Sequence, residues 1–218
     1  MFARSSAINC RLRCIQFCVA SALAVAACAQ PPAYDLVLVG GAVIDGTGSD
    51  RFEADVAIVG GQIAEVSREG LRTEGAARVI DATGKVVAPG FIDIHSHLDP
   101  LLRLPEGESK ARQGVTTVLG GPDGSAPLPL GQYLDSAAVL GVGVNVAMLV
   151  GHNSVRREIM GNDNRAPTST ELSEMQGLVQ RGMDDGAWGL STGLRYLPGA
   201  FSELDEVVAL AEVAGGAG

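Results

Sequence analysis

The chain has 218 residues, of which 46% are hydrophobic and 4% aromatic, and its formal net charge is −9. This hydrophobic content is enough for a packed core, so a disordered chain is excluded, and the length allows one large or two small domains. The acidic balance, with no stripe of basic residues, argues against nucleic-acid binding.

The first 28 residues have the pattern of an export signal. A basic start is followed by an apolar stretch at residues 14–27, which is too short to cross a bilayer comfortably as a permanent helix. The arginines of the basic start are Arg4, Arg11 and Arg13. Because small residues end the apolar stretch, we expect residues 1–27 to be a signal peptide.

All four cysteines of the chain lie in this same segment. If residues 1–27 are removed, at most Cys28 remains, which leaves no disulfide framework and no cysteine-based metal site. Residues 25–28 resemble the lipobox of bacterial lipoproteins, in which the cysteine becomes the lipid-modified first residue. We therefore expect an exported bacterial protein, in the periplasm or anchored to the membrane through Cys28. The alternative is an ordinary cleavage site with an incidental cysteine.

A short linker at residues 28–33 leads into a strand-rich block at residues 34–89. Its apolar runs predict strands at residues 35–39, 54–59, 63–66, 78–81 and 85–87. Gly40-Gly41 is predicted to be a turn, and Gly60-Gly61 has the composition of a two-residue hairpin. Residues 82–84 are predicted to form a second hairpin.

Strands and helices alternate in residues 90–218, which is typical of βα units around a parallel sheet. The predicted strands span residues 91–95, 115–119, 142–150 and 188–192, and helices are expected near residues 106–113, 133–140, 170–185 and from 203. Thr168 and Glu171 make a capping-box pattern at the third helix. A (β/α) barrel has eight such units in about 250 residues. The four units here predict an α/β fold with the first half of a barrel, in a chain that continues in a larger protein. A four-stranded sheet alone would keep an open edge.

Two of the three histidines, His95 and His97, stand two residues apart at the end of the strand predicted after Gly90. Side chains at positions i and i+2 leave the same face of a strand, so both imidazoles can reach one metal ion. Imidazole suits zinc and other divalent transition metals. The sequence therefore predicts a metal site at the end of a short buried strand. The alternative is a pair of hydrogen-bonded core histidines.

Several stretches of the chain together resemble a known enzyme superfamily. They span residues 34–48, 79–97, 114–118, 150–157 and 189–200. With the His-x-His motif, they resemble the amidohydrolase superfamily and, within it, the N-acyl-D-amino-acid deacylases (D-aminoacylases). The resemblance implies a small β-sandwich followed by a metal-dependent TIM-like barrel that hydrolyses the amide bond of N-acyl-D-amino acids. Hydantoinases and dihydropyrimidinases, which cleave cyclic amides, share the first half and are the alternative.

The resemblance also implies which residues form the metal site. It makes His95 and His97 the first two ligands of zinc, in a centre of one or two divalent ions. Asp123 stands at the position of the family's bridging cysteine. A carboxylate is also a zinc ligand, whereas Pro122-Asp123-Gly124 is by itself a good turn sequence. Both interpretations of Asp123 stay open at the level of sequence.

His152, Ser191 and Tyr196 are the candidates for substrate contact. His152 follows the third predicted strand, on the side where the catalytic groups of barrels gather. It is expected to touch the substrate, to orient a ligand, or to be a loop histidine bonded to the backbone. Ser191 and Tyr196 match substrate-pocket positions of the family motif. The catalytic group and the remaining ligands are expected beyond residue 218, so the second hypothesis is an inactive fragment with a partial metal site.

Overall fold

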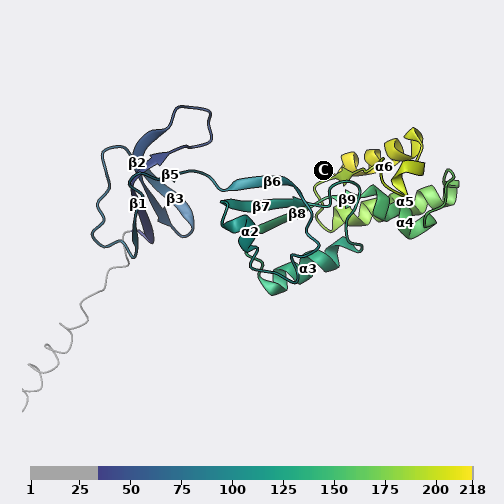
Figure 1. Cartoon of the computed structure of the whole chain (residues 1–218), viewed down its shortest axis with the longest axis horizontal. Coiled ribbons are helices and arrows are strands. Elements are labelled where there is room, and N and C mark those ends of the chain that lie inside the picture. Colours follow the sequence, from purple (N-terminus) through teal and green to yellow (C-terminus); the bar gives the residue numbers. More distant parts are fainter. Residues whose placement is uncertain (1–33, 218) are drawn as a thin grey trace, which may run out of the picture. The chain divides into compact units, whose positions relative to one another are not determined.

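The computed structural model of the chain describes residues 34–217 (Figure 1). The signal peptide expected at residues 1–27 and the lipid-modified Cys28 lie outside the described residues. The chain divides into two compact units, with the boundary between Pro89 and Gly90. Among the helices that the structure describes, none is both long and apolar enough to span a bilayer.

Residues 34–89 form one mixed five-stranded sheet. Its strands are β1 (Leu36–Val43), β2 (Phe52–Val59), β3 (Gln62–Ser67), β4 (Val79–Asp81) and β5 (Val86–Val87). The β1–β2 and β2–β3 pairs are antiparallel, whereas β4 and β5 both run parallel to β1. Val43, Ala54 and Val56 form a buried cluster on this sheet. The β-branched side chains of Val43 and Val56 suit this position because they pack well on a pleated surface.

Of the two predictions made for glycine pairs in this unit, one is confirmed and the other is wrong. Gly60-Gly61 joins β2 and β3 in a hairpin, as predicted, with φ angles of +58° and +76°. Positive φ at both central residues is the geometry that favours glycine in a two-residue hairpin. The turn predicted at Gly40-Gly41 is wrong, because β1 runs straight through these residues with a bulge between Leu38 and Gly41.

The hairpin predicted at residues 82–84 is also wrong. In the described sheet, β4 and β5 follow one another along the same edge of β1, opposite residues 37–39 and 42–43 respectively. The bulge in β1 accommodates the residues between them. A Cβ atom at Gly41 would come within 2.6 Å of the Val87 side chain, so this close approach requires glycine.

Residues 90–217 alternate strands and helices, as predicted, in a mixed α/β arrangement (Figure 1). The strands are β6 (Phe91–Ser96), β7 (Val115–Gly120), β8 (Asn145–Met148), β9 (Val150–Gly151) and β10 (Leu190–Ser191). The helices are α2 (Glu108–Ala111), α3 (Leu130–Leu140), α4 (His152–Met160), α5 (Ser169–Asp184), the 3₁₀ turn η1 (Gly199–Phe201) and α6 (Leu204–Ala217). All strand pairs in this unit are parallel, in the orders β6-β7-β8 and β9-β10.

The third predicted strand, at residues 142–150, is split into β8 and β9. Strand β8 pairs with β7, and β9 pairs with β10. Between them, the Leu149 N–H donates to the carbonyl of Gly120, the last residue of β7, at 2.9 Å. The chain therefore stays bonded to β7 up to the point where it begins to pair with β10. The carboxyl ends of β6 and β7 reach the same edge, where barrel-type folds place functional groups.

The apolar core of this unit lies between the strands and helices α3 to α6. Its fully buried side chains are Val118, Leu130, Met148, Val150, Val155, Met175, Val179 and Leu210. Helix α5 begins with the predicted capping box: the Thr168 hydroxyl accepts from the Glu171 N–H, and the Glu171 carboxylate accepts from the Thr168 N–H. This box satisfies two backbone donors at the start of the helix.

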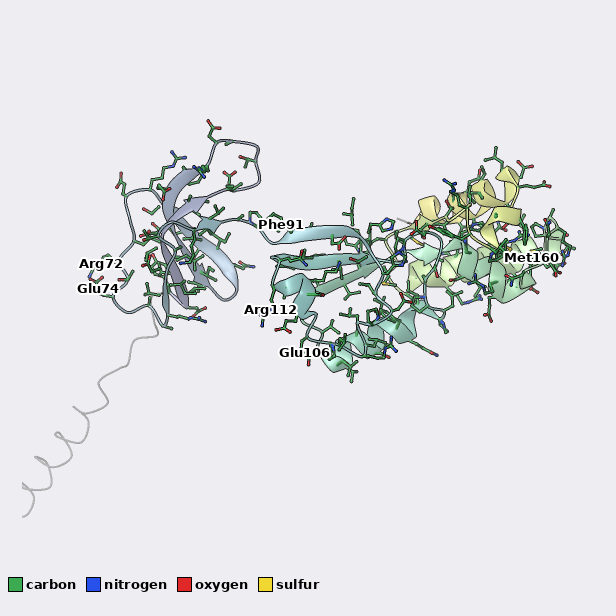
Figure 2. All side chains as sticks on the ribbon, in the orientation of Figure 1. Arg72, Glu74, Phe91, Glu106, Arg112 and Met160 are labelled. Atoms are coloured by element: carbon green, nitrogen blue, oxygen red, sulfur yellow. The ribbon has the colours of Figure 1, made fainter. Side chains whose placement is uncertain are left out.

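Strand β6 forms as predicted, but the prediction that it is buried is wrong. Phe91, which Figure 2 labels, is 61% exposed, and Ile92 and Ile94 are 65% and 73% exposed. The physical reason is position, since β6 pairs with β7 alone within the described sheet and so forms its edge.

Two helices differ from the expected pattern. The helix expected at residues 106–113 shrinks to the single turn α2, because Gly107 and Gly114 adopt left-handed conformations on either side of it. Helix α4 was not predicted at all. Its buried face includes the polar side chains of His152, Asn153 and Arg156, so it lacks the apolar stripe by which helices are recognised.

Candidate metal centre

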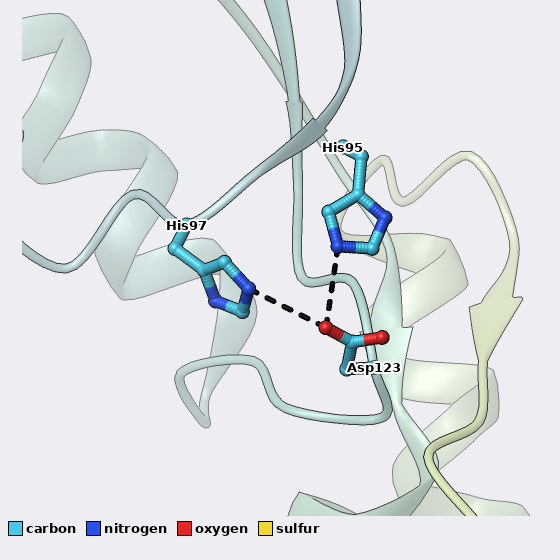
Figure 3. A group of neighbouring side chains, drawn as sticks. All are labelled: His95, His97 and Asp123. Carbon is cyan, nitrogen blue, oxygen red and sulfur yellow. Dashed lines mark hydrogen bonds and ion pairs between the residues drawn. The ribbon is translucent and has the colours of Figure 1, made fainter.

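Three side chains converge at the carboxyl ends of β6 and β7. His95 is the next-to-last residue of β6, His97 follows the strand, and Asp123 lies in the turn after β7 (Figure 3). The Asp123 Oδ2 atom is 3.2 Å from His95 Nε2 and 3.4 Å from His97 Nε2. The structure thus brings together the three residues that the sequence singled out for metal binding, with donor atoms within 4.8 Å of one another.

Asp93 holds the histidine-bearing end of β6 in place. Its carboxylate accepts hydrogen bonds from Lys110 Nζ at 2.5 Å, from Ser96 Oγ at 2.6 Å and from the His95 N–H at 3.1 Å. The hydrogen bond from Lys110 is the main reason why the pKa of Asp93 is held well below its usual range. The sequence analysis did not identify this role; the signal was an acidic residue within an otherwise apolar strand.

The donor set fits a divalent transition metal. Imidazole nitrogen and carboxylate oxygen are both zinc ligands, and a cluster of two imidazoles and one carboxylate is a common set for that ion. The side chains of His95 and His97 are 60% and 58% exposed, and that of Asp123 is 35% exposed. The alternative of a buried core pair of histidines is therefore wrong, and both rings are accessible to an ion.

Two cavities open beside His97. One, of about 580 Å³, has largely apolar walls that include Leu98, Leu101 and Val144. The other, of about 480 Å³, is more polar and includes Tyr133 and Arg157. Both volumes lie in the range of small-molecule sites, so a small substrate has room next to the candidate metal centre.

The predicted substrate residues Ser191 and Tyr196 differ in burial and in the contacts they make. Ser191, at the end of β10, is half-buried, and its hydroxyl is bonded to the turn that carries Asp123. Tyr196 is 58% exposed, and its hydrogen bonds are made by its backbone: its N–H donates to the Gly193 carbonyl at 2.9 Å, and its carbonyl accepts from the Ala200 N–H at 2.8 Å and from the Asn153 side-chain amide at 3.4 Å.

His152 lies apart from the three-residue cluster. It is fully buried at the start of α4, and its Nε2 atom is 2.8 Å from Glu206 Oε1 on α6. The other Glu206 oxygen accepts from Arg156, which also donates to the Arg165 carbonyl at 2.7 Å. The interpretation of His152 as a loop histidine bonded to backbone is wrong, since it belongs to a helix and bonds a carboxylate. The structure gives it a buried structural partner rather than a face open to substrate.

Comparison with known proteins agrees with this arrangement. The amidohydrolase family model matches residues 78–216. The D-aminoacylase of Alcaligenes xylosoxydans xylosoxydans is 36% identical over 200 residues, which are 80% of this chain and 41% of that protein. The N-acyl-D-glutamate deacylase of the same organism is 39% identical over 207 residues, 84% of this chain and 42% of that protein. The chain thus spans about two fifths of the length of these curated relatives.

Solved structures show the same relationship. The N-acyl-D-glutamate deacylase of Bordetella bronchiseptica, complexed with zinc and a phosphonate inhibitor, aligns with a TM-score of 0.77 at 38% identity, over 84% of this chain and 43% of that one. A crystal structure of D-aminoacylase aligns with a TM-score of 0.77 at 35% identity, over 84% and 44% of the two chains. With its histidine pair at the end of a parallel strand and its mixed α/β fold shared with these enzymes, the chain belongs to the amidohydrolase family.

Proposed function

We propose that a protein carrying this chain hydrolyses the amide bond of N-acyl-D-amino acids. The observation that carries the proposal is the convergence of His95, His97 and Asp123 at the strand ends, in a chain that is 36% identical to a D-aminoacylase and 39% identical to an N-acyl-D-glutamate deacylase. The cavities beside His97 are the proposed place for the substrate.

In this proposal, His95, His97 and Asp123 hold zinc or a similar divalent ion. The chemistry supplied by such an ion is the activation of water near neutral pH and the polarisation of a carbonyl group. Asp93, held by Lys110, orients His95 through the backbone of β6. Leu98, Leu101 and Val144 line an apolar wall that suits an acyl chain.

The finer architecture is part of the same proposal. The five-stranded sheet of residues 34–89 is proposed to belong to a β-sandwich, and β6 to β10 are proposed to be the first strands of a barrel. Parallel pairing throughout residues 90–217 and the similarity to the D-aminoacylase fold support it.

An assay with a defined substrate panel tests the function. The zinc-loaded protein is incubated with N-acetyl-D-glutamate, N-acetyl-D-aspartate and N-acetyl-D-methionine, with their L-enantiomers, and with hydantoin, and the products are separated on a chiral column. We expect release of free D-amino acids that stops when a chelator removes the metal. Cleavage of hydantoin alone would favour a cyclic-amide hydrolase, and no product from a metal-loaded protein would favour the inactive-fragment hypothesis.

Replacing Asp123 distinguishes a zinc ligand from a residue that only forms the turn. Asparagine tolerates the left-handed backbone of residue 123, where φ is +57°, but lacks the negative charge. We expect Asp123→Asn to weaken zinc binding at least about 10-fold, since it removes a ligand and not only a supporting contact. Competition with a chromophoric chelator gives the zinc dissociation constant.

Asp123→Cys is the matched variant, because a thiolate is also a zinc ligand. It should bind zinc more tightly than Asp123→Asn. If the asparagine variant binds zinc as well as the unmodified protein does, Asp123 is only a turn former.

A further inference from the structure

The turn that carries Asp123 has an unfavourable backbone conformation. Asp123 has a φ of +57°, and among the described residues no other residue with a side chain has a positive φ. Gly121 and Gly124, on either side of it, have φ angles of +76° and +73°. The left-handed region is disfavoured for most residues with a Cβ atom, although aspartate and asparagine adopt it more readily, so the contacts around the turn help to hold it in this shape.

Ser191 contacts this turn on both sides of Asp123. Its hydroxyl donates to the Gly121 carbonyl at 2.5 Å and accepts from the Gly124 N–H at 3.0 Å. These bonds join residues 70 and 67 positions apart in the sequence, so they tie the turn after β7 to the end of β10. One hydroxyl group thereby fixes the backbone immediately before and after the Pro122-Asp123 pair.

The backbone packs tightly around the same turn. A Cβ atom at Gly193 would lie 1.9 Å from the Asp123 carbonyl oxygen, and one at Gly151 would lie 2.5 Å from the Gly124 carbonyl oxygen. The turn is therefore enclosed by the chain at the ends of β9 and β10. Because the Asp123 side chain is still partly exposed, the enclosure fixes its backbone and leaves its carboxylate facing the histidines.

We propose that Ser191 is a positioning residue, which holds the Asp123 carboxylate at the distance from His95 and His97 that shared metal binding requires. This inference rests on the proposed metal site. Ser191 was expected to contact the substrate, but the single proton of its hydroxyl is already donated to Gly121. It could donate to a substrate only by releasing the turn.

Ser191→Ala tests this role, with Ser191→Thr as the rescue and Ser202→Ala as the matched control. Ser202 makes the same kind of bond, from Oγ to the Gly199 carbonyl at 2.5 Å, but in another loop. The rate of hydrogen exchange of the Gly124 amide in the metal-free protein measures how firmly the Ser191 hydroxyl holds the turn. Zinc affinity and the visible spectrum of the cobalt-substituted protein measure the position of Asp123.

In Ser191→Ala, we expect Gly124 to exchange faster, zinc affinity to fall about 10-fold, as for loss of a group that orients a ligand, and the cobalt bands to change. Ser191→Thr should restore all three, and Ser202→Ala should leave them unchanged. Unchanged zinc affinity and cobalt spectrum in Ser191→Ala would overturn the positioning role while leaving the metal site intact. If the unmodified protein binds no zinc although Gly124 is protected by Ser191, the proposed function has failed, and the positioning role fails with it.

Discussion

Replacing His97 with alanine is expected to lower zinc affinity by at least about 100-fold. The side chain supplies one of three donor atoms that lie within 4.8 Å of one another. Loss of a supporting partner already costs 10-fold to 100-fold in metal affinity, and a direct ligand should cost no less. Zinc content after dialysis, together with release of D-amino acid, measures the effect.

The control for this variant should change a side chain close to His97 that is not one of the proposed ligands. Glu106 lines the same cavity as His97 and takes no part in the three-residue cluster. Glu106→Gln is therefore expected to retain zinc as the unmodified protein does. Equal zinc content in His97→Ala and Glu106→Gln would contradict a role for His97 as a ligand.

The second large effect is expected on stability, at the buried contact between α4 and α6. Glu206 is 3% exposed and accepts hydrogen bonds from His152 and Arg156, both of which are fully buried. Glu206→Gln leaves the Arg156 guanidinium buried without its counter-charge. Removing one partner of a buried ion pair typically costs about 3–5 kcal/mol, and we expect a loss of this size in the free energy of unfolding.

Urea unfolding measures this loss, and Glu212→Gln on the exposed side of the same helix is the matched control. An exposed substitution of this kind should change the unfolding free energy by less than about 0.5 kcal/mol. The double variant Arg156→Met, Glu206→Gln should be more stable than Glu206→Gln, because it removes the uncompensated charge. If Glu206→Gln and Glu212→Gln are equally stable, the buried ion pair of Arg156 and Glu206 contributes nothing to the free energy of unfolding.

The same pair makes stability depend on pH. Burial favours the neutral form of Glu206, but the hydrogen bonds from His152 and Arg156 outweigh it, so the pKa of Glu206 lies below its ordinary value. A lowered carboxyl pKa stabilises the fold above the unfolded pKa of about 4.3, and this stabilisation is lost as the pH falls through the lower folded value. The stability difference between the unmodified protein and Glu206→Gln should therefore shrink below about pH 4.

Features that depend on neighbouring residues could be predicted from the sequence. The hairpin at Gly60-Gly61 and the capping box of Thr168 and Glu171 both formed as predicted, because short-range backbone geometry determines them. The spacing of His95 and His97 likewise follows from the two-residue period of a strand. That Asp123 lies beside them was expected from a family resemblance, and the parallel order of β6 and β7 is what brings it there.

Features that depend on distant partners were missed. The bulge of β1 between Leu38 and Gly41 can be understood only once β4 and β5 are seen to lie along the edge of β1. Helix α4 can bury His152 and Arg156 because both of them bond the carboxylate of Glu206, 54 residues after His152. The bonds of Ser191 likewise reach a turn almost 70 residues earlier. Local sequence patterns contain no information about such partners, so they indicate a turn, a loop or a substrate contact instead.

X-ray absorption at the zinc edge is the most direct test of the proposed metal centre. For the zinc-loaded protein, we predict a first shell of nitrogen and oxygen at about 2.0–2.2 Å, with the multiple scattering that imidazole rings produce. In His97→Ala, that imidazole signal should weaken, because one of the two rings is gone. A sulfur shell at about 2.3 Å, or a first shell without any imidazole signal, would contradict zinc binding by His95, His97 and Asp123.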